Sequence, residues 1–465
     1  MRLLKVTVMG NKKTSDETII AFAEVHKGDL ITAEYIDRVR KRLINTKLFK
    51  KVEVLWEESS KPGWAYLYLN CKDRWSWFIA PMFMYQKGHW GGAVAYGEGN
   101  LLGLGKRIGV VARWLTDSQA LAVGYQDPGM FGTHLVLKAG LGFERKLLKE
   151  YARILGPVMR QASPVRTIWS NQLFSSLGLG YKWLGRLQTG LEYRFGMVAL
   201  YHPRCAGQRI DADEPNDRCA APWDEFTGAY SSPIAFKQRD GTWKGSTYGG
   251  PKFWNWKRES ILRFHVGYDA TLDLFGVKQG WKVDARFDLS DRHLGSEFSY
   301  VRFQIYGYKA FRFFKAHVLE ISGKHEESYG APFHRENFMG GSSLPGFVYR
   351  QAVGDTNTAA RLAYTVPLFH VWWLYFRQVV YYKFAWIFFR GGGKNRPSYT
   401  EHDGIRRYHL AFEPGPKDRA SFLQSLGTGL RMYAKAVAMP LLGVDLAYGF
   451  EANAVRVLFY LGKNY

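Results

Sequence analysis

Two glycine-rich stretches beside basic residues are the first places in this chain where chemistry could occur. Gly103-Leu-Gly105-Lys106-Arg107 and Gly391-Gly-Gly393-Lys394 both bring glycine next to lysine, as a phosphate-binding loop does. Such a loop also needs a Ser or Thr directly after the lysine and a strand–loop–helix setting. Neither stretch has that hydroxyl residue, so neither predicts nucleotide binding.

No other set of side chains has a spacing that predicts catalysis. The 12 histidines are scattered, and neither His-x-x-x-His nor Gly-x-Ser-x-Gly occurs. Adjacent carboxylates such as Glu326 and Glu327 are more often solvated charge than an acid–base pair. The sequence therefore predicts a protein that is not an enzyme and that uses no cofactor and no metal.

The cysteines offer a structural role rather than a chemical one. Cys205 and Cys219 lie in one polar segment rich in Pro and Asp. A disulfide between them would close a short loop, contribute on the order of 3 kcal/mol and indicate an oxidising compartment. The alternative is two unpaired thiols, and the segment offers too few ligands for a metal.

The chain is strongly basic, with 64 Lys and Arg against 41 Asp and Glu and a net charge of +23. Such a balance first suggests nucleic acid. However, the basic residues are spread over the whole chain, without a helix-turn-helix pattern, a zinc spacing or a basic tail. We therefore expect no nucleic-acid partner. Anionic lipid headgroups or lipopolysaccharide suit this charge better, and a solvated surface is the simpler alternative.

Hydropathy excludes a membrane helix but leaves another kind of membrane protein open. No run of about 18 uncharged apolar residues occurs, so no transmembrane helix is predicted. Membrane strands alternate in polarity and give a much weaker signal. The first residues lack the apolar core of a signal peptide, so either the chain is cytosolic or a leader was removed before this numbering began. We expect the second.

Residues 1–75 are predicted to form a small α+β domain. In its second helix Ile36, Val39 and Leu43 share one face, which indicates a buried stripe. The order is β-α-α-β-β, with elements at Leu3–Met9, Asp16–Val25, a helix capped by Thr32, Phe49–Trp56 and Ala65–Cys71.

From residue 76 to residue 465 the apolar residues recur with a period of two. In Lys282–Leu289, for example, Val283 and Phe287 share one face while Asp284 and Arg286 share the other. Lys138 and Arg263 occupy the same kind of position in their own runs. Charges at every second position would strongly destabilise the packed core of a β-sandwich, but they are ordinary on the inner face of a wide barrel that holds water. The pattern predicts an all-β transmembrane barrel.

About 16 antiparallel strands are predicted, an even number as expected for bacterial barrels. Short turns alternate with long loops, and aromatic residues such as Trp372 and Trp373 gather near strand ends, as they do at membrane interfaces. The predicted strands begin near Trp77, Val94, Ile108, Ala120, His134, Thr167, Arg186, Ser260, Trp281, Tyr300, Phe314, Asn357, Leu374, Phe422, Val437 and Ala454. The short turns are expected at 129–132, 182–185 and 277–280, and the long loops at 148–166, 202–258, 323–356 and 391–420.

The loop at 323–356 contains Met339-Gly-Gly-Ser-Ser-Leu-Pro-Gly-Phe347. A stretch so rich in glycine is a poor strand or helix, because glycine loses the most backbone freedom on ordering. Leu344 and Phe347 would be unfavourable in water. We therefore expect this loop to fold back and plug the barrel.

Motifs along the whole chain resemble a known family. Residues 1–75 are similar to a POTRA domain in their element order and in Gly28, Ile36, Val39 and Leu43. The remainder resembles the BamA/TamA-type outer-membrane assembly and translocation superfamily, with a single POTRA domain. The matching motifs are Gly99-Asn-Leu-Leu-Gly103-Leu-Gly105, Asp127-Pro128, Gly280-Trp281, Gly340-Gly341 and Ala363-Tyr364-Thr365-Val366-Pro367-Leu368.

The chain departs from this family at two positions. The family loop carries an arginine that reaches an acidic residue on the inner wall. Here the arginine position is Pro345, before Gly346, and the acidic position is Arg390. Losing both partners is coherent, because one buried charge alone would cost several kcal/mol. We expect Leu344 and Phe347 to hold the loop instead, with Arg350 as a polar anchor.

The resemblance implies an outer-membrane protein with its POTRA domain in the periplasm and a role in inserting β-barrel clients. A weak seam between the first and last strands would open and template an incoming strand, at Trp77, Phe78, Ile79, Val455, Val457, Phe459 and Leu461. The alternatives are a translocation pore for secreted protein and a scaffold barrel in a larger complex. The expected partners are membrane lipid and lipopolysaccharide, the clients, and periplasmic or membrane accessory subunits.

Overall fold

The computed structural model describes most of the chain, in ranges separated by short gaps and a few longer ones. The described residues are 1–46, 48–86, 89–130, 133–151, 164–183, 186–201, 236–237, 243–244, 256–274, 277–314, 316–348, 351–372, 374–388, 397–402, 405–410, 421–434 and 440–461. Cys205, Cys219, Arg350 and Arg390 fall outside these ranges.

The N-terminal residues form a three-stranded sheet covered by two helices. Thr32 caps the second helix by accepting a hydrogen bond from the Tyr35 amide at 3.1 Å. The sheet order is β1-β3-β2, so β1 and β2 are its edges. The predicted order of elements is confirmed, with β1 at Arg2–Met9, α1 at Asp16–Ala23, α2 at Ala33–Asn45, β2 at Phe49–Glu58 and β3 at Trp64–Asp73.

The helices cover one face of this sheet. Val39 and Leu43 from α2 are fully buried against Leu67 and Leu69 of β3, as their spacing predicted. Cys71 lies in the same core, and its burial raises the pKa of the thiol to about 11, so the thiol stays protonated. The buried residues of this core cluster all lie between Leu3 and Cys71.

The following strands close into a barrel of sixteen antiparallel staves. Strands β13 and β14 lie end to end along β15 and form one stave. The predicted number of strands is therefore confirmed. In closed order from the N-terminal end they are β4 (Trp77–Gln86), β5 (His89–Leu101), β6 (Lys106–Leu115), β7 (Ser118–Asp127), β8 (Leu135–Tyr151), β9 (Pro164–Trp183), β10 (Leu187–Tyr201), β13 (Lys257–Asp269) with β14 (Leu272–Leu274), β15 (Val277–Ser290), β16 (Tyr300–Phe313), β17 (His317–Tyr329), β20 (Thr356–Val371), β21 (Leu374–Phe388), β24 (Ser421–Ala434), β25 (Pro440–Gly449) and β26 (Ala454–Leu461).

The two faces of the staves differ as the period of two predicts. Leu141 on β8 and Val283 on β15 are 59% and 37% exposed on the outer surface. On the inner face Asp284 binds Arg286 at 2.8 Å, and Arg263 binds Asp288 at 2.7 Å. The charges therefore line the interior and the large apolar side chains face outwards.

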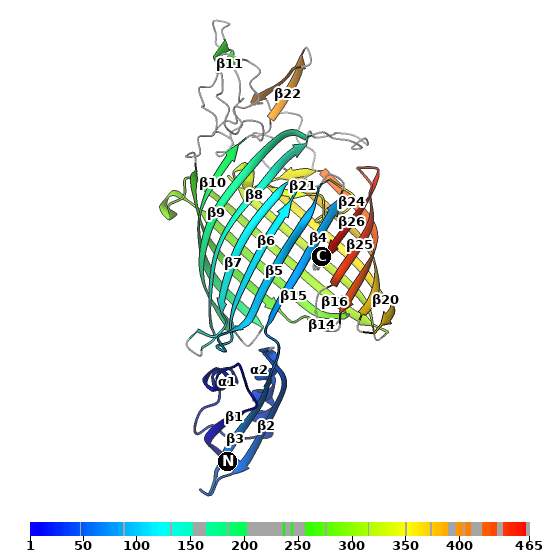
Figure 1. Cartoon of the computed structure of the whole chain (residues 1–465). Helices are drawn as coiled ribbons and strands as arrows, with labels where there is room; N and C mark the ends of the chain where they lie inside the picture. Colours follow the sequence, from blue (N-terminus) through cyan, green and yellow to red (C-terminus); the bar gives the residue numbers. More distant parts are fainter. Residues whose placement is uncertain are drawn as a thin grey trace.

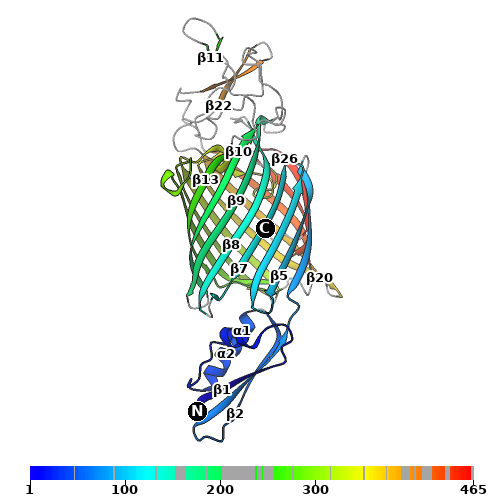
Figure 2. The same cartoon turned by 60° about the vertical axis from the view of Figure 1, so that its left-hand side comes forward.

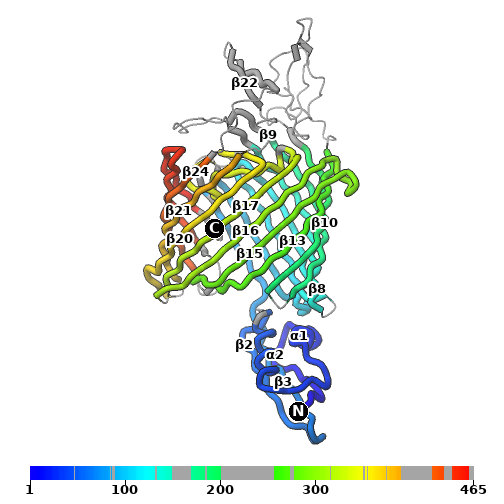
Figure 3. The backbone as a smooth tube through the Cα atoms, turned by 180° about the vertical axis from the view of Figure 1, so that it is seen from behind, coloured from blue at the N-terminus to red at the C-terminus, as the bar shows by residue number. Residues whose placement is uncertain are grey.

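The N-terminal unit lies at one end of the barrel, below the β5–β6 and β7–β8 turns (Figures 1 and 3). Short hairpins β11–β12 and β22–β23 lie at the other end, at Phe236–Lys237 with Trp243–Lys244 and at Pro397–His402 with Ile405–Leu410. None of the described helices is long and apolar enough to span a membrane.

Several sequence predictions about boundaries are wrong in detail. The loop expected at 148–166 is shorter, because β8 runs to Tyr151 and β9 begins at Pro164. Val277–Gly280 was expected as a turn, but it begins β15 and pairs with β14. Phe314 was expected at the start of a strand, but it lies in the turn before β17. That strand continues to Tyr329, so the loop begins later than residue 323. The division of the chain at residues 75 and 76 stays a prediction.

Candidate functional site

The loop after β17 folds into the barrel as a hairpin. Its stem is β18 (Asn337–Met339) paired with β19 (Ala352–Gly354). At the tip, the Gly341 amide donates to the Phe347 carbonyl at 3.1 Å, and the Gly340 amide donates to Ser343 Oγ at 3.1 Å. Gly340 and Gly341 both have positive φ, at 123° and 64°, which explains why the tight tip requires glycine there.

The tip is seated on the inner wall by two apolar side chains. Leu344 and Phe347 are both fully buried, as predicted from the sequence. They lie in one cluster with Ala385 and Ile387 of β21 and Leu423 of β24. Burying side chains of this size is worth roughly 1.5–3 kcal/mol each. The apolar anchor that the sequence predicted is therefore present.

Polar contacts hold the backbone of the tip. Ser425 Oγ donates to the Pro345 carbonyl, and Arg456 Nε donates to the Gly346 carbonyl at 3.2 Å. Gly346 has a φ of 96° and packs so closely on Gly449 of β25 that an added Cβ would lie 2.6 Å from the Gly449 nitrogen. The tip is thus fixed to β24, β25 and the last strand, β26.

Pro345 faces an ion pair that belongs entirely to the wall. Arg431 of β24 binds Asp445 of β25 with two contacts of 2.5 and 3.0 Å, and both residues are buried. Tyr381 donates to the same carboxylate at 3.4 Å. Pro345, Arg431 and Asp445 line one small cavity. The buried acid therefore receives its arginine from the neighbouring strand and not from the loop.

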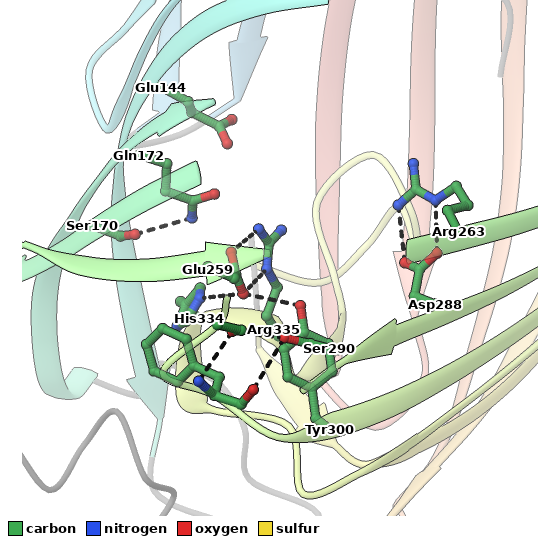
Figure 4. A network of polar contacts seen from close by, with 12 residues as sticks. Glu144, Ser170, Gln172, Glu259, Arg263, Asp288, Ser290, Tyr300, His334 and Arg335 are labelled. Atoms are coloured by element: carbon green, nitrogen blue, oxygen red, sulfur yellow. Dashed lines mark hydrogen bonds and ion pairs between the residues drawn. The ribbon is translucent and has the colours of Figure 1, made fainter. Parts of the chain in front are cut away.

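A second, charged anchor holds the base of the loop on a different part of the wall. The 3-10 turn Phe333–Arg335 brings His334 and Arg335 to Glu259 of β13. Arg335 Nε lies 2.9 Å and His334 Nε2 3.1 Å from Glu259 Oε1 (Figure 4). Tyr300 of β16 donates to the same oxygen at 2.9 Å. Glu259 is only 2% exposed, and these partners compensate for the loss of its hydration.

Further contacts continue this anchor along the stem. Arg302 donates to Asn337 at 2.7 Å and to Glu326 at 3.1 Å, and Asn357 donates to Glu326 at 3.1 Å. The Asn337 amide donates to the Asp355 carbonyl at 2.9 Å. The loop therefore connects two parts of the barrel wall: its base contacts β13 and β16, and its tip contacts β24–β26.

The seam where the first and last staves meet is short. Among the described residues, β4 and β26 share two register pairs, Phe459 with Tyr85 and Tyr460 with Met84. By comparison, β4 shares ten pairs with β5, and β26 shares eight with β25. The only predicted seam residue in these pairs is Phe459. Trp77, Phe78 and Ile79 lie at the N-terminal end of β4, outside these pairs. Val455 and Val457 of β26 are exposed and are also outside the pairs, and β26 ends at Leu461.

The N-terminal unit is fastened to the turn between β5 and β6. Lys13 Nζ binds Glu98 at 2.9 Å, and the Ser15 amide donates to the Gly103 carbonyl at 3.0 Å. A Cβ on Gly103 would lie 2.1 Å from the Lys13 carbonyl, and one on Gly105 would lie 2.4 Å from the Phe22 ring. The glycines of this turn therefore make room for the N-terminal unit, which explains a motif that the sequence only flagged.

One carboxylate organises the segment that makes these contacts. Asp73 accepts hydrogen bonds from the Lys12 and Lys13 amides at 2.6 and 2.7 Å and from the Thr14 hydroxyl at 2.5 Å. Burial raises the pKa of Asp73, but these hydrogen bonds outweigh it, so its pKa lies below the usual value. The Thr14 hydroxyl also accepts from Asn100 at 2.8 Å, which joins this turn to the barrel.

Below the loop, the barrel encloses a charged cavity of about 650 Å³. Lys278 binds Glu320 at 2.9 Å there, and the predicted lumen residues Lys138, Arg263, Asp284 and Arg286 lie on the same inner face. No group of three or more His, Cys, Asp or Glu residues suited to a metal occurs in the part of the chain described above.

No motif or spacing in the sequence indicates Glu259, Arg335, Ser425 or Arg456 as residues that hold the loop. Each acts through a partner at least 75 residues away in the chain. No local spacing encodes such pairs.

We predict that Gly346→Ala weakens the barrel. The new Cβ meets backbone atoms of β25, and the left-handed φ adds strain, so the cost is about 1–3 kcal/mol. The measurement is the temperature at which the folded band is lost on unheated gels. Gly307→Ala is the control, because a Cβ there meets nothing within 4 Å. Equal melting of the two variants would contradict this assignment.

Glu259→Gln is expected to cost about 3–5 kcal/mol, because it leaves Arg335 buried beside a neutral group. Thermal unfolding in detergent measures the loss. Glu192→Gln is the matched control, because its carboxylate lies 3.9 Å from Arg263 and its side chain is 31% exposed, so its loss is expected to cost at most about 1 kcal/mol. A Glu259 variant as stable as this control would show that the loop base is held by other contacts.

Comparisons with known proteins agree with this architecture. The Omp85 superfamily domain model matches residues 100–456. Among solved structures, BamA from Haemophilus ducreyi lacking POTRA domains 1-3 is similar with a TM-score of 0.62 at 14% identity, over 99% of this chain and 84% of that one. No curated protein sequence gives a significant match.

Two CdiB structures are similar to nearly the same degree. CdiB from Acinetobacter baumannii has a TM-score of 0.58 at 14% identity, over 99% of this chain and 73% of that one. CdiB from Escherichia coli has a TM-score of 0.59 at 12% identity, over 99% and 76%. At such identities these likenesses show the fold alone.

The family model spans well over half of the chain, and the barrel with its folded-in loop fits it. Omp85 proteins are outer-membrane β-barrels that act in protein insertion and transport, and their members are non-catalytic. The resemblance of the barrel to this superfamily, noted from the sequence, is thereby confirmed, whereas the single POTRA domain stays a prediction. This chain belongs to the Omp85 superfamily and is an outer-membrane β-barrel.

Proposed function

We propose that the protein is an assembly factor that inserts client β-barrels into the outer membrane by opening the seam between β4 and β26. The observation that supports this most is the shortness of the seam, with two register pairs among the described residues against ten and eight on the other sides of the same two strands. Because fewer hydrogen bonds must break there, the barrel wall opens at the seam first.

An open seam would be a template for a client strand. Peptide groups exposed to lipid cost several kcal/mol each, so the free edges of β4 and β26 would favour pairing with an incoming strand. The outer residues there, such as Ile79 and Val455, are apolar and 60% and 61% exposed, which suits a surface in contact with lipid and a client.

The loop and the seam are physically linked in this proposal. Arg456 projects from β26 and donates to the Gly346 carbonyl at the loop tip. Leu458, the next inward residue on β26, lines the cavity beside Pro345. A movement of β26 away from β4 therefore strains or breaks the contact with the loop. The loop thus resists opening of the seam until pairing with a client strand compensates for the lost contact.

In this proposal the N-terminal unit is a POTRA domain that lies in the periplasm. Its order of two helices between strands and its place at the barrel end reached by the short turns support this reading. β2 is an edge of the sheet, so an extended client segment can add to it as a further strand. The unit is fixed to the rim, so a segment bound there is held close to the start of β4.

A disulfide across the seam tests the main proposal. Tyr85→Cys with Phe459→Cys places two cysteines at directly opposed positions, in a background with Cys205 and Cys219 replaced by serine. We expect the oxidised variant to lose most of its ability to insert a client barrel into lipid vesicles, because the edges can no longer separate. Reduction is expected to restore the activity.

The control places a disulfide across a fully paired part of the wall, with Ala139→Cys and Leu177→Cys between β8 and β9. This crosslink is expected to leave client insertion unchanged. Undiminished insertion by the oxidised seam variant would rule out a gating seam.

The alternative is a translocation pore, which the charged interior favours. Residues such as Lys138, Arg263 and Asp284 would then contact a substrate in the lumen. Deleting residues 340–348 with the seam crosslinked separates the two functions in planar bilayers. An export pore predicts large, stable openings that allow substrate passage, whereas a seam-acting insertase predicts no passage.

A further inference from the structure

The charged cavity below the loop is lined by more basic than acidic side chains. Its volume of about 650 Å³ lies within the range of pockets that bind small molecules. Three carboxylates line it, from Asp269, Glu320 and Glu326, together with six Lys or Arg side chains. A cavity lined mainly by one sign of charge attracts small ions of the opposite sign.

The three carboxylates are already compensated by basic residues of the same wall. The ion pairs are Lys282 with Asp269 at 3.1 Å, Lys278 with Glu320 at 2.9 Å, and Arg302 and Lys324 with Glu326 at 3.1 and 2.8 Å. These pairs do not include the two other basic residues of the lining, Arg361 of β20 and Lys383 of β21. The positive charge of this cavity is therefore greatest at β20 and β21.

Arg361 is the basic residue with the largest unused capacity to bind an anion. Its guanidinium makes no ion pair and no hydrogen bond with the described residues, and its Nε is shielded from solvent. A guanidinium has five N–H donors, and leaving them unused inside a protein is costly. Arg361 also lies directly opposite Lys383 in the register of β20 and β21, so two like charges are neighbours. Tyr381 compensates in part, because its ring centroid lies 5.6 Å from each cation.

These two cations lie where the loop tip meets the wall. Arg361 and Lys383 line both the large cavity and the small one beside Pro345, and so does Ser342 of the loop tip. The Ser342 hydroxyl makes no hydrogen bond with any residue in the described ranges, so it can donate to a ligand. From the tip the cavity extends to Leu272 of β14, at the end of the barrel that carries the N-terminal unit (Figures 1 and 2).

We propose that this cavity binds a water-soluble compound that carries a phosphoryl group and at least two negative charges, between the loop tip and the inner wall. Arg361 binds the phosphoryl oxygens through parallel N–H donors, Lys383 supplies a second charge, and Ser342 donates from the loop. A phosphoryl group carries up to two charges and so balances both cations, whereas one carboxylate balances only one. The cavity lies inside the barrel and away from lipid, so a free compound suits it better than a lipid headgroup.

Such a ligand adds a contact between the loop and the wall. The protein's own contacts hold the tip on β21 and on β24–β26. The ligand joins Ser342 to β20 and β21 as well, so it stabilises the folded-in loop over any arrangement in which the tip has left the wall. This inference depends only on the described loop and wall, and it holds for an insertase and for a translocation pore.

Calorimetric titration with sodium pyrophosphate tests the site, on the full chain in uncharged dodecyl maltoside micelles. We expect saturable binding of one ligand per chain. Arg361→Gln is expected to weaken binding by about 10- to 100-fold, which corresponds to the loss of a charged hydrogen bond. Arg361→Lys keeps the charge but not the planar set of donors, so its affinity is expected to lie between those of Arg361→Gln and the parent. Ser342→Ala is expected to weaken binding by roughly 2- to 10-fold.

Arg286→Gln is the matched control. It removes a guanidinium from the inner face, but Arg286 binds Asp284 at 2.8 Å and does not line the cavity. This variant is expected to bind pyrophosphate as the parent does. A parent without saturable binding would overturn the proposal, and so would equal weakening by Arg286→Gln and Arg361→Gln, since it indicates general attraction to a basic interior. Folding of each variant is checked on unheated gels, and Ser342→Ala, which removes only a hydroxyl, decides the matter if Arg361→Gln does not fold.

Two further titrations test the chemistry of the ligand. Malonate carries two carboxylates in place of two phosphoryl groups, and it is expected to bind more weakly than pyrophosphate. Equal affinity would overturn the choice of a phosphoryl compound. Phosphatidic acid added to the micelles is expected to leave the pyrophosphate affinity unchanged. Competition by this lipid would overturn the assignment to a water-soluble compound.

Discussion

Lipid offers no hydrogen-bond partner to a peptide group, and this constraint shapes the whole barrel. Every stave needs a neighbour on both sides, so the chain must close on itself. Closure brings β26 to β4, and the described residues pair there over two positions only. The wall next to this seam is also where the loop tip rests, on Ser425, Gly449 and Arg456. The loop tip therefore supports, from inside the barrel, the part of the wall that has the fewest paired residues.

The two anchors of the loop differ in chemistry and hence in how they respond to movement. The base is a buried carboxylate surrounded by Arg335, His334 and Tyr300, and removing any charge from it leaves another unpaired. The tip is held by apolar burial of Leu344 and Phe347 and by hydrogen bonds to backbone carbonyls. Because a backbone carbonyl carries no net charge, the tip can separate from β26 at a lower cost than the base from β13.

The strands could be predicted from the sequence because their period is local, and all sixteen staves correspond to predicted runs. The burial of Leu344 and Phe347 followed from their apolar side chains in a glycine-rich loop. Long-range partners could not be predicted in this way, since nothing near Glu259 indicates that Arg335 will meet it. Residues 277–280 were wrongly predicted as a turn, although they begin β15. Gly280 marks a close approach to Ala270 within paired strands, where a Cβ would lie 2.1 Å from the Ala270 carbonyl.

Pro345 and the ion pair formed by Arg431 and Asp445 fit each other physically. In the related family a loop arginine reaches the wall, and at this position the space is already filled. The cavity beside Pro345 has a volume of about 10 Å³, close to that of a single water, and Arg431 supplies the cation that Asp445 needs. A second guanidinium there would lack room and would face a like charge. Proline has no donor to leave unsatisfied, and its carbonyl is used by Ser425. The loop therefore keeps its place without an ion pair at its tip, and its charge is placed instead at its base.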